Sequence, residues 1–337
     1  MLAKFREGDF IETSDGNIFD VKGLVHPTGK VIAFIRYTPN QKGERKKGKA
    51  TYQKVYPLQE RYKLLKESFP QYLVHDNVFD EWLCEVSTNV IKCHYKPTDN
   101  LRMLRQKRRL TSLESAALGF AELLKKSARI PWNALGISGS LLVELHTAKS
   151  DIDIIAYGTQ NCYKVYDSLK TLVRNRNKVK SNDTEELRRL FGFRSKDTNV
   201  SFEDFVRTES RKVLQGRYDE YDYFVRCVKD WGEINERYGD LHYSNVGYTR
   251  IRATIIGDSE AIFTPCTYRV ENVRILEGKI SKRISEIVSF RGRFCEQAEK
   301  NEMVVAQGKL ERVRSEKGEE YFRLLLGNTP SDFMVLA

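Results

Sequence analysis

Two aspartates and a Ser-Gly-Ser triplet are the residues whose types and spacing can do chemistry. In GISGSLLVELHTAKSDIDIIAYG, residues 136–158, Asp151 and Asp153 open an otherwise apolar run. Side chains two apart on a strand point to one face. Two carboxylates held that close repel each other, and a divalent cation removes the repulsion. Because Mg²⁺ prefers oxygen ligands, the pair predicts a site for Mg²⁺ or Mn²⁺.

The triplet Ser138-Gly139-Ser140 suits a phosphate group. It lies where a strand expected at 134–138 passes into a helix expected at 141–147, and backbone N–H groups at a helix start bind phosphate. Gly139 permits close backbone approach, and the two serines offer hydroxyl donors. With a strand expected at 152–157, this unit presents a phosphate cradle beside a metal site, as phosphoryl or nucleotidyl transfer requires. The alternative is a helix cap followed by a strand whose acidic start faces water.

The same stretch resembles the nucleotidyltransferases of the DNA polymerase β superfamily. Their signature is Gly-Ser or Gly-Gly, a helix, and then Asp-x-Asp or Asp-x-Glu, which Gly139-Ser140 and Asp151-x-Asp153 match. The resemblance covers about residues 134–158 and extends loosely to 230, while the whole chain is similar to uncharacterised archaeal proteins predicted to be nucleotidyltransferases. It implies two Mg²⁺ (or Mn²⁺) ions, a nucleoside triphosphate substrate and a third carboxylate on a neighbouring strand.

We assign the third carboxylate to Asp222, because the strand-like run YDYFVRCV, residues 221–228, begins there. On that strand Arg226 shares a face with Asp222, so it can neutralise triphosphate charge. An ordinary ion pair is the alternative for Arg226. The competitors for the third carboxylate are Asp219, Glu220, Asp230, Glu203 and Asp204.

The net charge of +11 favours a polyanionic partner, and three basic clusters concentrate it in residues 40–49, 102–109 and 174–180. Such runs are often only solvated loops, but three in one chain favour nucleic acid, and RNA is the acceptor we expect. The predicted nucleic-acid-binding residues are Arg45, Lys46, Lys47, Arg105, Arg108, Arg109, Arg174 and Arg176.

The 337 residues read as an α+β chain of four parts. We expect a β-rich N-terminal module at 1–57, a helical or irregular connector at 58–107, a polymerase-β-like catalytic domain at 108–240 and a small β-barrel-like domain, of OB-like type as one option, at 241–337. At the start of the expected catalytic domain, Thr111 and Glu114 fit a capping box that begins a helix. Aromatic residues of the last domain either stack bases or form its core: Phe290, Phe294, Tyr321 and Phe322.

Together these patterns predict a cytoplasmic nucleotidyltransferase that adds a nucleotide to RNA. No apolar run reaches membrane-spanning length, so we expect no membrane partner, and the first ten residues lack the apolar core of a signal peptide. The six cysteines form no Cys-x-x-Cys pair, which argues against a zinc or redox motif. The alternatives are transfer to a protein or small molecule, and a catalytically weak nucleic-acid-binding scaffold.

Overall fold

Three β-sheets organise a mixed α+β chain in the computed structural model, which describes residues 4–195, 199–278 and 283–337. Backbone contacts divide the chain into two units. The first comprises residues 1–74, 82–180 and 213–235, and the second residues 75–81, 181–212 and 236–337. Within the described ranges, no helix is both long and apolar enough to cross a membrane.

The first sheet begins with the predicted N-terminal β-rich region. Its opening hairpin turns at Gly16, where φ is +83°, and the Thr13 N–H donates to the Asn17 carbonyl at 3.0 Å. A glycine suits this turn because L side chains rarely adopt a positive φ. The first five strands are β1 (Phe10–Thr13), β2 (Ile18–Val21), β3 (Lys30–Pro39), β4 (Arg45–Lys47) and β5 (Ala50–Lys54), paired in the order β4-β5-β3-β2-β1.

The expectation of a helical or irregular connector at 58–107 was wrong in its middle part. Helices α1 (Leu58–Ser68) and α2 (Pro97–Gln106) are present. Between them, β7 (Glu81–Ser87) pairs with β3 and with β6 (Leu73–Asp76), while β8 (Ile91–Tyr95) pairs with β1. The buried side chains of Cys84 and Val86 help to form the core of the first sheet. The two prolines at 70 and 97 mark the ends of this segment and do not make it irregular.

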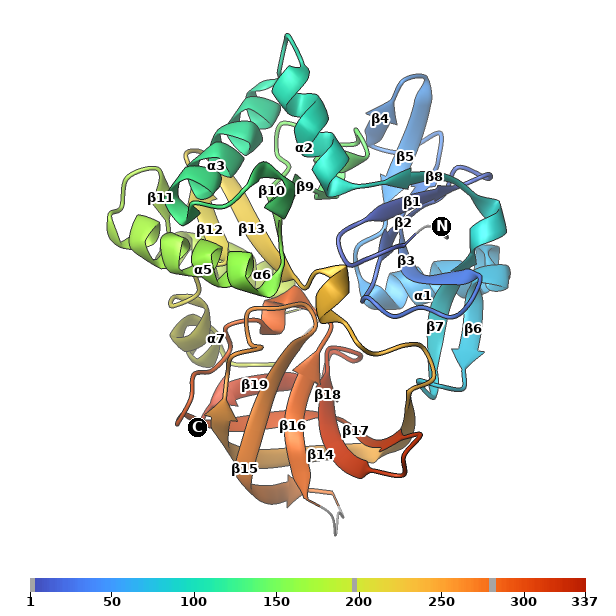
Figure 1. Cartoon of the computed structure of the whole chain (residues 1–337), viewed down its shortest axis with the longest axis vertical. Helices are drawn as coiled ribbons and strands as arrows, with labels where there is room; N and C mark the ends of the chain where they lie inside the picture. The colour runs from blue at the N-terminus through green and yellow to red at the C-terminus, as the bar shows by residue number, and fades with distance from the viewer. Residues whose placement is uncertain (1–3, 196–198, 279–282) are drawn as a thin grey trace. The chain divides into compact units, whose positions relative to one another are not determined.

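The second sheet and the turns next to it carry the predicted catalytic residues. Its order is β11 (Val179–Lys180), β12 (Gln215–Tyr218), β13 (Tyr221–Val228), β10 (Ile152–Tyr157) and β9 (Leu135–Ile137). Strands β10 and β13 are parallel, and the other pairs are antiparallel. Helices α3 (Ser112–Ala128) and α5 (Thr159–Arg174) pack against this sheet and against each other (Figure 1).

Helix α3 begins as the sequence predicts. The Glu114 N–H donates to Thr111 Oγ1 at 3.3 Å, and the Thr111 N–H donates to Glu114 Oε2 at 2.9 Å, which completes the capping box. The apolar face is buried, with Phe120 and Leu124 both fully excluded from solvent. Short 3₁₀ turns occur elsewhere, at Pro70–Tyr72, Thr88–Val90, Trp132–Ala134, Trp231–Glu233 and Gly292–Phe294.

The second unit contains a curled sheet preceded in the chain by helices α6 (Thr184–Arg194) and α7 (Phe202–Glu209). Strand β14 pairs with both β15 and β17, so the pairings return to their starting strand, and β16 runs parallel to β18. Of the four aromatic residues considered as base-stacking groups, Phe294 and Phe322 are buried core residues. The strands are β14 (Leu241–Gly257), β15 (Cys266–Glu277), β16 (Ile284–Ser289), β17 (Met303–Ser315), β18 (Glu320–Leu326) and β19 (Phe333–Leu336).

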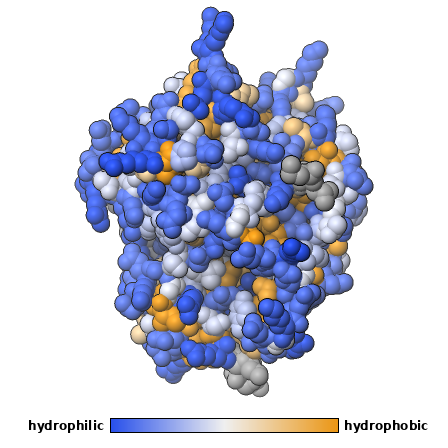
Figure 2. All heavy atoms as spheres, in the orientation of Figure 1, coloured by the Kyte–Doolittle hydropathy of each residue, from blue (hydrophilic) through white to orange (hydrophobic). Residues whose placement is uncertain are grey.

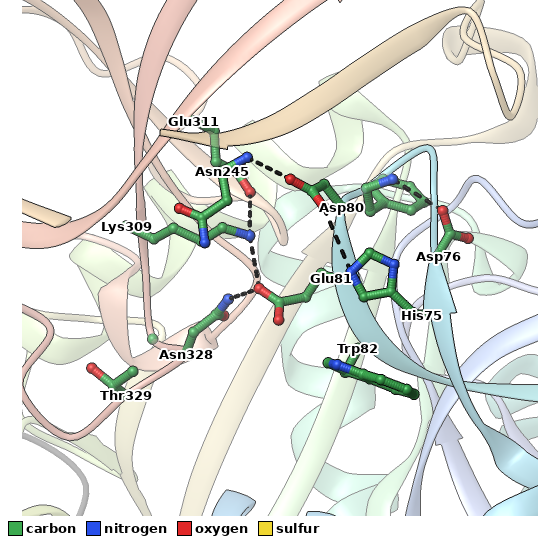
Figure 3. Close-up of polar contacts among 12 residues, drawn as sticks. His75, Asp76, Asp80, Glu81, Trp82, Asn245, Lys309, Glu311, Asn328 and Thr329 are labelled. Carbon is green, nitrogen blue, oxygen red and sulfur yellow. Dashed lines mark hydrogen bonds and ion pairs between the residues drawn. The ribbon is translucent and has the colours of Figure 1, made fainter. Parts of the chain in front are cut away.

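A separate short segment, residues 75–81, also belongs to the second unit. The Lys309 ammonium lies 2.7 Å from Glu81 Oε2, and the Asn245 N–H donates to Asp80 Oδ2 at 2.9 Å (Figure 3). Lys309 is buried and Glu81 is half-buried, so water screens their attraction less than it would at an open surface. The segment is therefore bound to β14 and β17 by specific polar contacts.

Hydrophilic residues cover most of the face shown in Figure 2, and apolar residues form small patches among them. Such a surface agrees with a chain in which 31% of residues are charged.

The capping box yields a stability prediction. Thr111→Ala removes the side-chain acceptor for the Glu114 N–H, so the free energy of unfolding should fall by about 1 kcal/mol. Ser112→Ala, at the next and exposed position, should change it far less. Guanidinium unfolding of both variants and the wild type measures the difference, and equal losses in the two variants would contradict the role of the cap.

Candidate active site

Asp153 lies in strand β10, and Asp151 immediately precedes that strand. Asp151 is exposed and Asp153 is half-buried, while Ile152 and Ile154 point to the opposite face and are fully buried. Burial first, and then the negative charge of Asp151, raises the pKa of Asp153 from 3.8 to about 7. The negative charge of Asp153 is therefore disfavoured in the folded chain, and a nearby cation would stabilise it.

Gly139 is in direct contact with Asp153. The Ser138 N–H donates to the Asp153 carbonyl at 2.8 Å, and Gly139 takes a φ of +63°. A Cβ atom at position 139 would overlap the Asp153 carboxylate. Both the positive φ and this approach require glycine. The two halves of the sequence motif, twelve residues apart in the chain, thus lie against each other.

The two serines of the triplet have different environments. Ser138 Oγ donates to the Gly8 carbonyl at 2.6 Å and is buried. Ser140 Oγ is also buried, but it has no hydrogen-bond partner among the residues that the structure describes. A buried hydroxyl without a partner is costly. Of the two, Ser140 is the hydroxyl that has capacity for a ligand.

The expected helix at 141–147 was wrong in its bounds. Helix α4 spans only Gly139–Leu142, and Glu144, at a φ of +58°, cannot continue it. A single turn sums few peptide dipoles, so the argument for phosphate binding at a helix start loses force. What remains is the close backbone of Gly139 and the hydroxyl of Ser140.

Asp222 lies at the same end of the second sheet as Asp151 and Asp153. The register pairs Ile152 with Tyr223, so the residues before them, Asp151 and Asp222, start neighbouring parallel strands. The Asp222 side chain is 52% exposed, and its Oδ1 lies 4.0 Å from Arg217 Nε. In the described ranges, no three His, Cys, Asp or Glu side chains are grouped so as to hold a metal ion. The third carboxylate therefore stays a prediction.

The competing acids have other surroundings. Asp219 Oδ2 lies 3.8 Å from the Lys178 ammonium, and Asp230 Oδ1 lies 3.3 Å from Arg6 Nη1. Glu220 is exposed at the turn between β12 and β13. Two others lie on α7 in the second unit, Glu203 and Asp204.

Arg226 makes the ion pair that the sequence left open as an alternative. Its Nη1 lies 2.8 Å from Glu7 Oε1, and the buried Glu7 also accepts a hydrogen bond from the Gly23 N–H at 2.7 Å through Oε2. The Arg226 charge also acts on Asp153 and lowers its pKa, against the larger effect of burial. Sequence reasoning missed Glu7, because it lies 219 residues from its partner.

Arg45, predicted to bind nucleic acid, is engaged within the chain. Its Nη1 donates to the Leu145 carbonyl at 3.2 Å, to Thr147 Oγ1 at 3.3 Å and to Ser150 Oγ at 3.0 Å. Residue 150 immediately precedes Asp151. Arg45 therefore connects the β4–β5 hairpin of the N-terminal sheet to the loop that leads into the aspartate pair.

The other predicted basic residues remain mostly at the surface. Lys47 donates to the Tyr95 hydroxyl at 2.8 Å, and the Arg105 guanidinium lies 4.1 Å from the centre of the Trp132 ring. The exposed ones are Lys46, Arg105, Arg108, Arg109, Arg174 and Arg176. Their contact with RNA stays a prediction.

Two further cations, missed by sequence reasoning, act on the pair. Arg36 on β3 and Lys54 at the end of β5 both lower the pKa of Asp153. Their effects are smaller than those of burial and Asp151, which raise this pKa, and smaller than that of Arg226, which also lowers it. In the sequence Arg36 is one polar residue in a strand, and nothing local connects it to a motif 115 positions later. Only the packing of the N-terminal sheet brings it to the site.

The donor set fits a divalent cation. Two carboxylates lie close together, and the backbone of Gly139 packs against the second of them. The raised pKa of Asp153 means that its negative charge is disfavoured, and a bound divalent cation would stabilise that charge. Asp151 and Asp153 are the residues that would hold the ion.

The raised pKa of Asp153 predicts how stability depends on pH. Because the folded pKa lies above the ordinary value of 3.8, its contribution to stability is complete below about pH 4 and is lost as pH rises through about 7. In EDTA, the free energy of unfolding of Asp153→Asn should therefore rise relative to that of the wild type as the pH increases from 4 to 8. The rise across this range should be at least about 1 kcal/mol.

Chemical unfolding at several pH values measures this gain. The control is Asp99→Asn, an exposed carboxylate on α2 that should leave the profile parallel to that of the wild type. A parallel profile for Asp153→Asn as well would contradict the assignment.

Comparisons with known proteins give one relative. No family model matches the chain, and no solved structure matches it. The uncharacterized protein MJ1086 of Methanocaldococcus jannaschii is 31% identical over 347 aligned positions, which cover 98% of this chain and 97% of that protein. At this identity and coverage, the chain belongs to the same protein family as MJ1086.

Proposed function

We propose that the protein is a metal-dependent nucleotidyltransferase that moves a nucleoside monophosphate from a nucleoside triphosphate to an acceptor hydroxyl. The observation that carries the proposal is the contact between Gly139 and Asp153. It joins a glycine turn to a carboxylate pair on the strand β10, as the resemblance to the polymerase β superfamily leads one to expect. The second sheet, with α3 and α5 against it, is the proposed catalytic domain.

In this proposal each residue has a defined part. Asp151, Asp153 and Asp222 would hold two Mg²⁺ or Mn²⁺ ions, which supply Lewis acidity to the acceptor hydroxyl and to the departing pyrophosphate. Ser140 Oγ, buried and without a partner in the described residues, donates to a phosphate oxygen. The turn at Gly139 lets the triphosphate approach the backbone closely.

The reaction that these residues serve is a displacement at the α-phosphorus. The acceptor oxygen forms a new bond to that phosphorus, and the bond from it to the oxygen that bridges the α- and β-phosphates breaks. Pyrophosphate leaves with the electron pair, and the proton of the acceptor hydroxyl passes to water. The 52% exposure of the Asp222 side chain supports its part as the carboxylate nearest the acceptor.

RNA is the acceptor that the chain favours. Exposed arginines and Lys46 contribute to the net charge of +11, which attracts a phosphate backbone. The curled sheet of the second unit has the pairing order β14-β15-β16-β18-β17-β14, with β16 parallel to β18. We interpret this as an OB-like barrel, a form that often binds oligonucleotides. Protein or small-molecule acceptors and a catalytically weak scaffold are the competing possibilities.

The metal assignment predicts binding that needs both aspartates. The wild type should bind a non-hydrolysable nucleoside triphosphate with Mg²⁺ or Mn²⁺, and Asp151→Asn and Asp153→Asn should each weaken this at least about tenfold, because a lost carboxylate leaves metal and phosphate charge uncompensated. Isothermal titration calorimetry with and without EDTA is the measurement. Unchanged affinity in the double variant would remove the metal site from the proposal.

Asp222 yields a test of the chemical step. Asp222→Asn keeps the size of the side chain but removes its charge, so triphosphate binding should stay near normal while transfer falls by about a hundredfold or more. Labelled nucleotide incorporation into cellular RNA and into protein measures transfer and identifies the acceptor class. Asp219→Asn is the matched control on the adjacent turn. An active Asp222→Asn with an inactive Asp219→Asn would move the role to Asp219, and no transfer by the wild type would favour the scaffold.

A further inference from the structure

Arg36 on β3 and Lys54 on β5 are two cations that share one aromatic neighbour and whose charges act on Asp153. The Arg36 guanidinium lies 4.6 Å from the centre of the Tyr56 ring, and the Lys54 ammonium lies 5.6 Å from the same ring. Within the described residues, neither side chain makes a hydrogen bond or an ion pair to a carboxylate. Both are only partly exposed to solvent. Burial of a cation is costly, and nearby anions reduce this cost: the charges of Asp20 and Asp153 raise the pKa of Arg36 against the effect of burial.

Two other cations of this module, Lys22 and Arg61 on α1, have a carboxylate partner. The Lys22 ammonium lies 3.1 Å from Asp20 Oδ2, and Arg61 Nη1 lies 3.5 Å from Asp20 Oδ1. Asp20 thus already has two partners. Its charge reaches Arg36 as well, but only through space.

The strands that carry the two cations are fixed to the active-site loop. Arg45 on β4 pairs with Tyr52 on β5, and its guanidinium holds the loop before Asp151. Tyr52 and Tyr37 pack in one buried cluster with Leu142, at the end of α4. In the β3–β5 ladder, Tyr37 lies opposite Lys54. The strands that carry the two cations therefore also contribute Tyr37 and Tyr52 to the buried cluster with Leu142.

The charges at the site agree with this arrangement. Burial lowers the pKa of Lys54, the nearby Arg36 lowers it further, and Asp151 acts in the opposite direction. Two close cations repel each other, and two close carboxylates do the same. An added cation at the aspartates and an added polyanion between the two pairs would relieve both repulsions.

We propose that Arg36 and Lys54 bind the β- and γ-phosphates of the nucleotide whose metal ions are held by Asp151 and Asp153. This inference rests on the proposed nucleotidyl transfer and deepens it. It makes the N-terminal sheet a contributor to the proposed active site. A triphosphate carries more negative charge than a monophosphate, so these residues select for the triphosphate over the product-like monophosphate.

The test compares two probes on the full-length protein. The affinities of a non-hydrolysable nucleoside triphosphate and of the matching nucleoside monophosphate, both with Mg²⁺, are measured by titration calorimetry for wild type, Arg36→Gln, Lys54→Gln and the double variant. Each single change should weaken triphosphate binding about tenfold and the double change more, while the affinity for monophosphate changes less than about threefold. Inorganic tripolyphosphate should follow the triphosphate.

Two controls separate binding from folding. Lys66→Gln removes an exposed positive charge on α1 of the same module and should leave both affinities unchanged. If Arg36→Gln does not fold, Arg36→Lys, which keeps the charge, and Lys54→Gln carry the test. Arg36→Lys should retain part of the triphosphate affinity, because it loses only the forked geometry of the guanidinium.

The outcomes distinguish this inference from the function on which it rests. If triphosphate binding depends on Asp151 and Asp153 but not on Arg36 or Lys54, the inference is wrong and the proposed function stands. Equal losses for triphosphate and monophosphate would also overturn it, since the cations would then not act on the β- and γ-phosphates. A wild type that binds no triphosphate would overturn both.

Discussion

The repulsion between Asp151 and Asp153 is the constraint around which the first unit is built. The two carboxylates lie close together, and the glycine at 139 brings the backbone against the second of them. Because Asp153 is half-buried, water does not fully screen its charge, and cations of the chain act on it. Arg226 comes from the neighbouring strand, and Arg36 and Lys54 come from another sheet. Two sheets are thus needed to hold one pair of charges.

The N-terminal sheet contacts both parts of the candidate site. It is bound to the loop before Asp151 through Arg45 and to the glycine turn through the hydrogen bond from Ser138 to Gly8. Gly8 itself contacts Ile155 closely enough that a Cβ would force a shift. An accessory domain on a flexible linker would make no such contacts. The N-terminal sheet is part of the site.

The sequence predicts well those features that depend on residues close together in the chain. Alternating apolar residues predict β10 and β13, and the Thr111–Glu114 spacing predicts the start of α3, because each depends on side chains only a few positions apart. The aspartates and Gly139 follow from the same short stretch. The length of α4 does not, since the helix ends where Glu144 takes a positive φ that no helix-breaking residue announces.

The missed features all depend on distant pairings. Strand β7 pairs with β3, about fifty residues earlier, so its short apolar alternation gave too little signal alone. Glu7, Arg36 and Lys54 reach the aspartates only after the N-terminal sheet has formed and packed onto the glycine turn. No window of neighbouring residues contains that information. Sequence patterns therefore locate the reactive residues but not the charges that surround them.

The bound segment at residues 75–81 has a consequence for the assembly of the chain. The polypeptide passes between the two units five times, at residues 74, 81, 180, 212 and 235. A chain of two consecutive units would cross only once, so neither unit here is a continuous stretch of the sequence. This arrangement also means that ribosomal synthesis cannot finish either unit before most of the chain has emerged. The last strands must be made before Lys309 can meet Glu81, 228 residues upstream, and a chain with such distant contacts should fold slowly.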